Sequence, residues 1–180
     1  MRLPHPLRLA LALLLASLAA CGTMPPGDAS APLTFVVVRH AEKATDDPGN
    51  PGLSAAGQAR AVALAHRLRD APLVAAYATE FRRTQQTAQP TADAHAVPVK
   101  AYYARGPARE IAAQWKLAHH GGSVLVVGHS NTVPDLVAAL CGCETAPMDD
   151  SEYDRLSLVR IGSDGRATLE VGRYGASPSP

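Results

Sequence analysis

The sequence has no excess of charge of either sign and few cysteines. Its 180 residues include 17 basic, 16 acidic and only 3 cysteine side chains, for a net charge of +1, and 47% are hydrophobic. This balance argues against a disordered chain and against a nucleic-acid-binding protein, which would carry a basic patch. Without a basic field over the whole molecule, a site for an anionic ligand has to be local. The length suits one domain with a substantial core.

The apolar run near the N-terminus is too short to span a bilayer as a helix. Residues 9–20 form an uncharged segment rich in leucine and alanine, preceded by Arg2 and Arg8, whereas a spanning helix needs about 20 apolar residues. A short basic region followed by an apolar core is typical of a secretory signal peptide. We therefore expect residues 1–20 to be removed, which takes the net charge to about −1.

Cys21 directly follows Leu18-Ala19-Ala20. This ending resembles the bacterial lipobox, whose cysteine is lipidated and becomes the mature N-terminus. An ordinary signal peptide cleaved near Ala20 is the alternative. The lipoprotein interpretation predicts a protein anchored in the bacterial cell envelope and facing the periplasm, and Gly22 favours the outer membrane. Residues 21–32 would then be the lipidated cysteine and a flexible linker.

Cys141 and Cys143 stand in a Cys-Gly-Cys segment. An oxidising compartment would allow them to bridge, but this spacing closes a very small ring. No further residues with metal-ligand spacing accompany them, so no metal or cofactor is expected. The preferred interpretation is a helix end followed by a turn that carries two small residues.

Strand and helix patterns alternate between residues 33 and 174, and this alternation predicts a three-layer α/β/α sandwich with a mostly parallel central sheet. Apolar, β-branched runs predict the strands, whereas Ser54 as an N-cap, prolines at helix starts and glycines at helix ends delimit the helices. Pro90 should kink or split its helix. Residues 175–180 are expected to be a disordered tail. The predicted strands are 33–39, 73–78, 97–101, 123–127, 155–161 and 167–171, and the predicted helices are 55–69, 81–95, 107–120 and 134–140.

Two histidines directly follow two of the predicted buried strands. Arg39 and His40 come at the end of the first, and His129 follows residues 124–128. Ligands of open α/β sheets bind beyond the carboxyl ends of the strands, so we expect both imidazoles at one site. A neutral imidazole is a good nucleophile toward phosphorus, and a phosphohistidine is labile enough to be hydrolysed.

Arginines stand where a phosphate site would need them. Attack on a phosphate dianion requires local positive charge, and the planar guanidinium binds phosphate bidentately. Arg39 adjoins the predicted nucleophile, and Arg82 and Arg83 follow the second predicted strand at the same sheet edge. Residues 128–132 lead into a helix N-terminus, whose free N–H groups also favour an anion.

These segments, in this order, resemble the histidine phosphatase superfamily, the phosphoglycerate mutase-like group. The resemblance extends over roughly residues 33–172 and includes a further similar segment near the end, Tyr153-Asp154-Arg155-Leu156. The first two of its four motifs are Arg39-His40-Ala41-Glu42-Lys43, which is similar to the family's RHG/RHA signature, and Leu53 to Ala59, which is similar to its helix opening. The other two are Thr79 to Ala88, which is similar to its Ser-x-x-x-Arg segment, and Gly128-His129-Ser130-Asn131-Thr132, which matches its second-histidine motif.

The resemblance implies the phosphoglycerate mutase-like fold and a role for each matching residue. His40 would be the nucleophile that becomes phosphohistidine. The phosphate pocket would be formed by Arg39, Arg83 and His129, and Asn131 would add a hydrogen bond.

The general acid that protonates the leaving group has no obvious residue. Larger family members carry a glutamate after the third strand, but residues 101–106 contain no carboxylate here. Glu42, which the resemblance places at the pocket rim, is the first candidate, with Glu110 and Asp135 as weaker ones. Without an acid, the enzyme would prefer good leaving groups such as those of phosphoramidates, acyl phosphates or aryl phosphates.

The sequence thus predicts a metal-independent phosphatase acting on phosphate esters or phosphoramidates through a phosphohistidine. Short connections predict an open pocket, which suits hydrolysis better than mutase activity. The substrate would be a phosphorylated small molecule, an envelope glycolipid or a phosphoprotein. Two alternatives stay open: a non-catalytic phosphate-ligand binding protein on the same fold, and a mutase or phosphotransferase.

Overall fold

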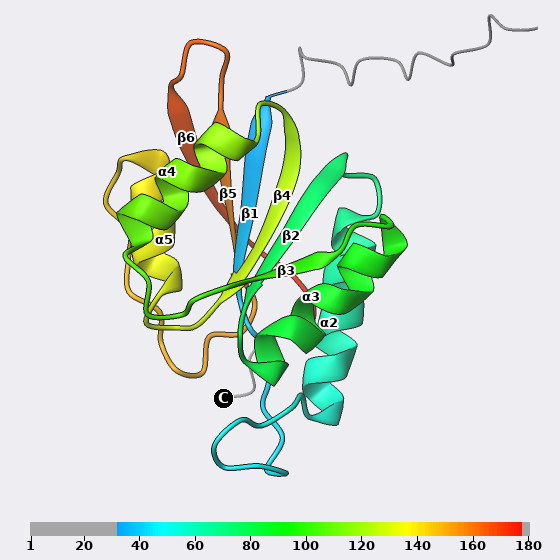
Figure 1. The fold of residues 1–180 in the computed structure, drawn as a ribbon. Helices are drawn as coiled ribbons and strands as arrows, with labels where there is room; N and C mark the ends of the chain where they lie inside the picture. The colour runs from blue at the N-terminus through cyan, green and yellow to red at the C-terminus, as the bar shows by residue number, and fades with distance from the viewer. Residues whose placement is uncertain (1–31, 178–180) are drawn as a thin grey trace, which may run out of the picture.

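The computed structural model of this protein describes residues 32–177 (Figure 1). The predicted signal segment 1–20, Cys21 and nearly all of the predicted linker lie outside the described residues, as does the end of the predicted tail. Within the described part, no helix is long and apolar enough to cross a membrane. The elements are β1 (Leu33–Arg39), α2 (Ala55–Leu68), β2 (Leu73–Thr79), α3 (Arg82–Ala94), β3 (Val99–Tyr102), α4 (Ala108–Ala118), β4 (Gly122–Gly128), α5 (Val133–Cys141), β5 (Arg155–Ile161) and β6 (Ala167–Arg173).

A six-stranded sheet in the order β3-β2-β4-β1-β5-β6 forms the centre of the molecule. Strands β3, β2, β4 and β1 run parallel, β5 is antiparallel to β1, and β6 closes the edge as a hairpin with β5. Helices α2 and α3 cover one face and α4 and α5 the other (Figure 1). The predicted three-layer α/β/α architecture with a mostly parallel sheet is confirmed.

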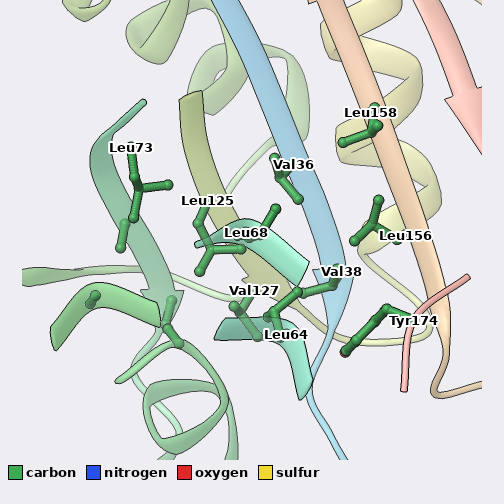
Figure 2. Packing of buried hydrophobic residues seen from close by; sticks show 14 residues of the cluster. Val36, Val38, Leu64, Leu68, Leu73, Leu125, Val127, Leu156, Leu158 and Tyr174 are labelled. Carbon is green, nitrogen blue, oxygen red and sulfur yellow. The ribbon is translucent and has the colours of Figure 1, made fainter. Parts of the chain in front are cut away.

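The central strands are apolar along their whole length because both of their faces are covered. Successive side chains of a strand point to opposite faces. Val36 of β1 therefore lies in one core cluster with Leu125 and with Leu68 of α2 (Figure 2). Its neighbour Phe35 joins the second core, which contains Trp115 of α4.

Helix α3 runs from Arg82 to Ala94 through Pro90 without a break, so the proline does not split the helix; whether it kinks stays a prediction. Proline removes one backbone donor from a helix interior. The helix face that contains Thr87, Ala88 and Thr91 is fully buried, and this packing outweighs the lost hydrogen bond. Strand β3 also begins at Val99, two residues later than predicted.

Cys141 and Cys143 are joined by a disulfide bond, with their Cα atoms 5.2 Å apart. The expected helix end is present, but the preference for an unbridged turn was wrong. Gly142 caps α5 with a φ of 66°, a left-handed conformation that glycine adopts at little cost. The chain turns back sharply there, which brings the two Cα atoms within bridging distance.

Candidate active site

Strand pairing brings the two histidines of the sequence motifs together. Arg39 lies opposite Gly128 across β1 and β4, and the backbone N–H of His40 donates to the Gly128 carbonyl at 2.9 Å. The rings of His40 and His129 therefore leave the sheet side by side, with centroids 5.3 Å apart in an edge-to-face arrangement. Both side chains are buried, with 4% and 7% of their residue surfaces exposed.

His40 is held with one ring nitrogen free. Its Nδ1 lies 2.8 Å from the carbonyl oxygen of Ala41, so Nδ1 carries the proton and Nε2 has a free electron pair. Burial lowers the pKa of His40 to about 3, and the nearby charges of Arg39, His129 and Arg83 act in the same direction. The result is a neutral imidazole near neutral pH.

Thr79 and Arg83 fix the orientation of His129. Its Nε2 lies 2.9 Å from Oγ1 of Thr79, and its Nδ1 lies 3.4 Å from Nη2 of Arg83. A guanidinium can only donate, so Nδ1 is the acceptor and Nε2 carries the proton. Burial, followed by the charge of Arg83, lowers the pKa of His129 to about 4.

The guanidinium of Arg39 is positioned by the loop that precedes β5. Nη1 lies 3.2, 2.8 and 3.3 Å from the carbonyl oxygens of Asp149, Asp150 and Glu152. The guanidinium carbon lies 4.0 Å from the centroid of the Tyr153 ring. The Nε atom is buried without a hydrogen-bond partner, and a buried donor of this kind is costly unless a ligand satisfies it.

Arg83 and Arg82 differ sharply although they are neighbours at the start of α3. The guanidinium of Arg83 packs over the Phe81 ring at 4.5 Å, and its Nε is also buried without a partner. Burial and the charge of Arg39 lower the pKa of Arg83. Arg82 instead makes a half-exposed ion pair with Asp46 at 3.1 Å.

The side chains of two arginines, Arg39 and Arg83, and two neutral imidazoles thus lie together beside the first turn of α3. The two lowered imidazole pKa values and the lowered pKa of Arg83 share their largest cause, burial away from water, and nearby positive charges lower them further. A bound dianion would offset these positive charges. Chemically, the arrangement is suited to binding a phosphoryl group and to attacking it from Nε2 of His40.

Glu42 is not placed as a general acid, and this expectation is corrected. Its carboxylate accepts three hydrogen bonds from the guanidinium of Arg60, at 2.7 to 3.0 Å. Burial acts to raise the pKa of Glu42, but the hydrogen bonds and charge of Arg60 outweigh it and hold the pKa below its usual range. An ionised carboxylate cannot donate a proton. Glu110 and Asp135 are exposed, in the first turns of α4 and α5.

Asn131 is exposed beyond His129, and its contact with a phosphate stays a prediction. From the sequence, no role was assigned to three supports of the site: Thr79, the loop 149–153, and Thr87, whose Oγ1 accepts from the Ala41 N–H at 2.9 Å. A signal for Thr87 was present, because threonines recur along one face of the predicted helix. Within residues 32–177, no group of three or more His, Cys, Asp or Glu side chains is placed to hold a metal ion.

Comparison with known proteins finds one matching family model, over part of the chain, and several solved structures with the same fold. Residues 35–104, which include His40 and Arg83, match the model of the histidine phosphatase superfamily (branch 1). No curated protein matches the sequence. The solved structure of the protein histidine phosphatase SixA complexed with tungstate has a TM-score of 0.66 and 22% identity, over 78% of this chain and 96% of that chain.

Two further solved structures are similar. A mycobacterial glucosyl-3-phosphoglycerate phosphatase has a TM-score of 0.62 and 15% identity, over 79% of this chain and 99% of that one. A phosphoglycerate mutase from Bacillus anthracis has a TM-score of 0.59 and 17% identity, over 80% and 94%. Residues 35–104 thus resemble the histidine phosphatase superfamily, and the described chain shares its fold with these phosphatases and with the phosphoglycerate mutase.

Proposed function

We propose that the protein is a metal-independent phosphatase that cleaves phosphate esters or phosphoramidates through a phosphohistidine at His40. One observation carries the proposal: a neutral, buried His40 with a free Nε2 lies close to the positive charges of Arg39 and Arg83. In this reaction the Nε2 electron pair forms the N–P bond while the bond to the leaving group breaks. Water then hydrolyses the phosphohistidine and releases phosphate.

The surrounding cations stabilise the phosphoryl group as charge spreads over its equatorial oxygens. Arg39 and Arg83 supply fixed positive charge. A bound dianion would raise the pKa of His129, so that Nδ1 takes up a proton and donates to a phosphoryl oxygen while Nε2–H stays on Thr79. His129 thereby responds to the charge of the substrate.

The ion pair between Glu42 and Arg60 suggests which leaving groups are preferred. With Glu42 held ionised, leaving groups that need little help from an acid are favoured. These include aryl and acyl oxygens, and the nitrogen of a phosphoramidate that is already protonated. One similar structure is that of a protein histidine phosphatase. We therefore propose phosphoramidates, including phosphohistidine in proteins, as the first natural substrate class to test.

The test is hydrolysis of p-nitrophenyl phosphate with EDTA present, by the full-length chain carrying Cys21→Ala. We expect turnover, and we expect His40→Ala to reduce kcat by roughly 10³-fold or more, because it removes the nucleophile. Because the N–P bond of phosphohistidine is labile in acid, rapid quenching with denaturant at neutral pH should trap phosphate on the parent chain and not on the variant. Matching thermal unfolding curves would show that the variant is folded.

Three results would contradict the proposal. Full activity of His40→Ala would exclude this nucleophile, and loss of activity in EDTA would exclude a metal-independent reaction. Binding of inorganic phosphate without turnover of aryl phosphate or phosphoramidate would favour the binding-protein alternative.

We also propose that Cys21 carries a lipid that anchors the domain to the bacterial cell envelope, on the periplasmic side. The support is the order of the basic region, the apolar run and Leu18-Ala19-Ala20-Cys21. Cys21→Ala should move the protein from the membrane fraction to the soluble fraction after cell fractionation, while Cys141→Ala should not. Unchanged membrane association of Cys21→Ala would argue against lipidation.

A further inference from the structure

The disulfide between Cys141 and Cys143 lies at the opposite end of α5 from the phosphate pocket. Helix α5 begins at Val133, soon after His129, and ends at Cys141. At 1.5 Å per residue, its length separates the two ends by about 13 Å. The phosphatase mechanism proposed above makes no use of this bond.

The bond also contributes little to holding the fold together. A crosslink stabilises a protein chiefly by restricting its unfolded chain, and the effect grows with the length of the closed loop. Here the two cysteines are separated by two positions in the sequence and share one turn, so the closed loop is near the minimum. Stability therefore gives no strong reason for the bridge.

The bond is accessible to other molecules. Cys143 is exposed, whereas Cys141 is half-buried. Cys143 also lines a groove of about 850 Å³ between α4 and α5, together with Gly142, Arg109 and Glu110. A thiol-bearing molecule can approach Sγ of Cys143 from this groove. Exposed disulfides are the ones that exchange readily.

The local backbone favours Cys141 as the leaving sulfur. The N–H of Cys143 points at Sγ of Cys141, with 3.2 Å between nitrogen and sulfur. This donor stabilises the thiolate that forms when the bond opens, which offsets the unfavourable negative end of α5. A side chain added at Gly142 would meet no atom within 4 Å, so the turn is open to solvent at this position.

We propose that Cys141 and Cys143 form a thiol–disulfide exchange site that acts on dithiols and on accessible protein thiols. A thiolate of the dithiol attacks Sγ of Cys143, forms a mixed disulfide and releases Cys141 as a thiolate, which takes up a proton. The second thiolate of the dithiol then attacks the dithiol's first sulfur, which is bonded to Sγ of Cys143. This step closes the dithiol into a disulfide and releases Cys143 as a thiolate, which takes up a proton. Two electrons pass to the pair, the dithiol becomes a disulfide, and the reverse sequence oxidises the pair again.

The first test follows the redox state of the pair in the full-length chain carrying Cys21→Ala, in which these are the remaining cysteines. The oxidised protein is mixed with reduced dithiothreitol, quenched with acid at intervals and alkylated, and its thiols are counted by mass spectrometry. We expect two thiols to appear together, about tenfold faster than the same dithiol reduces oxidised glutathione. Oxidised dithiothreitol should restore the bond. Free thiols in protein purified without reductant, or reduction no faster than that of oxidised glutathione, would overturn the proposal.

A second test identifies the sulfur that is attacked. Reduced glutathione, a monothiol, is added to the oxidised Cys21→Ala chain, and the mixed disulfide is trapped with acid and located by peptide mapping. Glutathione should be found on Cys143, at least about tenfold more than on Cys141; equal amounts or the reverse order would overturn the assigned direction. Exchange in His40→Ala should match that of the parent, because the site is independent of the phosphatase reaction.

Discussion

At the scale of single residues, adjacent arginines have different surroundings because they lie in the first turn of a helix. Each step along a helix rotates the side chain by about 100°, so Arg83 points toward His129 while Arg82 points toward the exposed Asp46. The buried Nε of Arg83 is an unfilled donor. The charge of the phosphate pocket therefore depends on the register of α3, because a shift of one residue would turn the guanidinium of Arg83 away from His129.

This difference predicts unequal effects of two matched substitutions. Arg83→Ala should lower kcat/KM for p-nitrophenyl phosphate by about 10²-fold or more, because one preorganised donor to the phosphoryl oxygens is lost. Arg82→Ala removes an exposed ion pair worth at most about 1 kcal/mol of stability and should leave kcat/KM near the parent value. Steady-state kinetics of both variants decides the matter, and a larger loss in Arg82→Ala would show that the roles of the two arginines are reversed.

At the scale of elements, the position of α2 under the site depends on a close backbone approach. Gly57 lies in the first turn of α2, and a Cβ atom there would come within 2.3 Å of the carbonyl oxygen of Glu42. Only glycine fits. The approach lets Arg60, one turn later, reach the carboxylate of Glu42 and the carbonyl oxygen of Tyr174. The loop after His40 is thereby tied to α2 and to the end of β6.

Gly57→Ala should therefore reverse the usual effect of this substitution in a helix. Alanine is normally favoured over glycine in a helix by about 1 kcal/mol, but here we expect destabilisation of about 1–3 kcal/mol from the backbone clash. Urea unfolding monitored by circular dichroism measures the change. The control is Gly172→Ala, where the added methyl group meets no atom within 4 Å. A more stable Gly57→Ala protein would show that the approach is not tight.

At the scale of the whole molecule, burial of the site imidazoles links folding to pH. The folded-state pKa values of His40 and His129 are about 3 and about 4, whereas the ordinary value is 6.5. As pH falls below 6.5, the unfolded chain binds these protons first, so the free energy of unfolding decreases. The stability is present above pH 6.5 and is lost as pH falls through the folded-state pKa values.

We therefore expect His40→Gln to flatten the pH dependence of stability between pH 6.5 and 4.5. One group contributes a slope of at most about 1.4 kcal/mol per pH unit, so the parent and variant slopes should differ by up to this amount. Urea unfolding at a series of pH values measures both. His66→Gln, a substitution at an exposed position of α2, should keep the parent slope. Parallel curves for His40→Gln and the parent would contradict a buried neutral His40.

The sequence by itself determined the architecture and the residues to inspect. Continuous β-branched runs such as the one before Arg39 form only where both sheet faces are covered, so periodicity was enough to predict the layers. Parallel strands end at one sheet edge, so His40 and His129 were expected at the same place. The family motifs separated Arg83 from Arg82 before any geometry was known.

Only the tertiary structure decided the partners of those residues. From the sequence, Glu42 was the first candidate for the general acid, but Arg60, eighteen positions later, donates hydrogen bonds to its carboxylate and keeps it ionised. The carbonyl groups that hold Arg39 come from residues more than a hundred positions away. The bridge at Cys141 depends on the left-handed backbone of Gly142. Periodicity records which face of an element is buried, but a side chain's charge state and contacts are set by whichever distant group the fold brings to it.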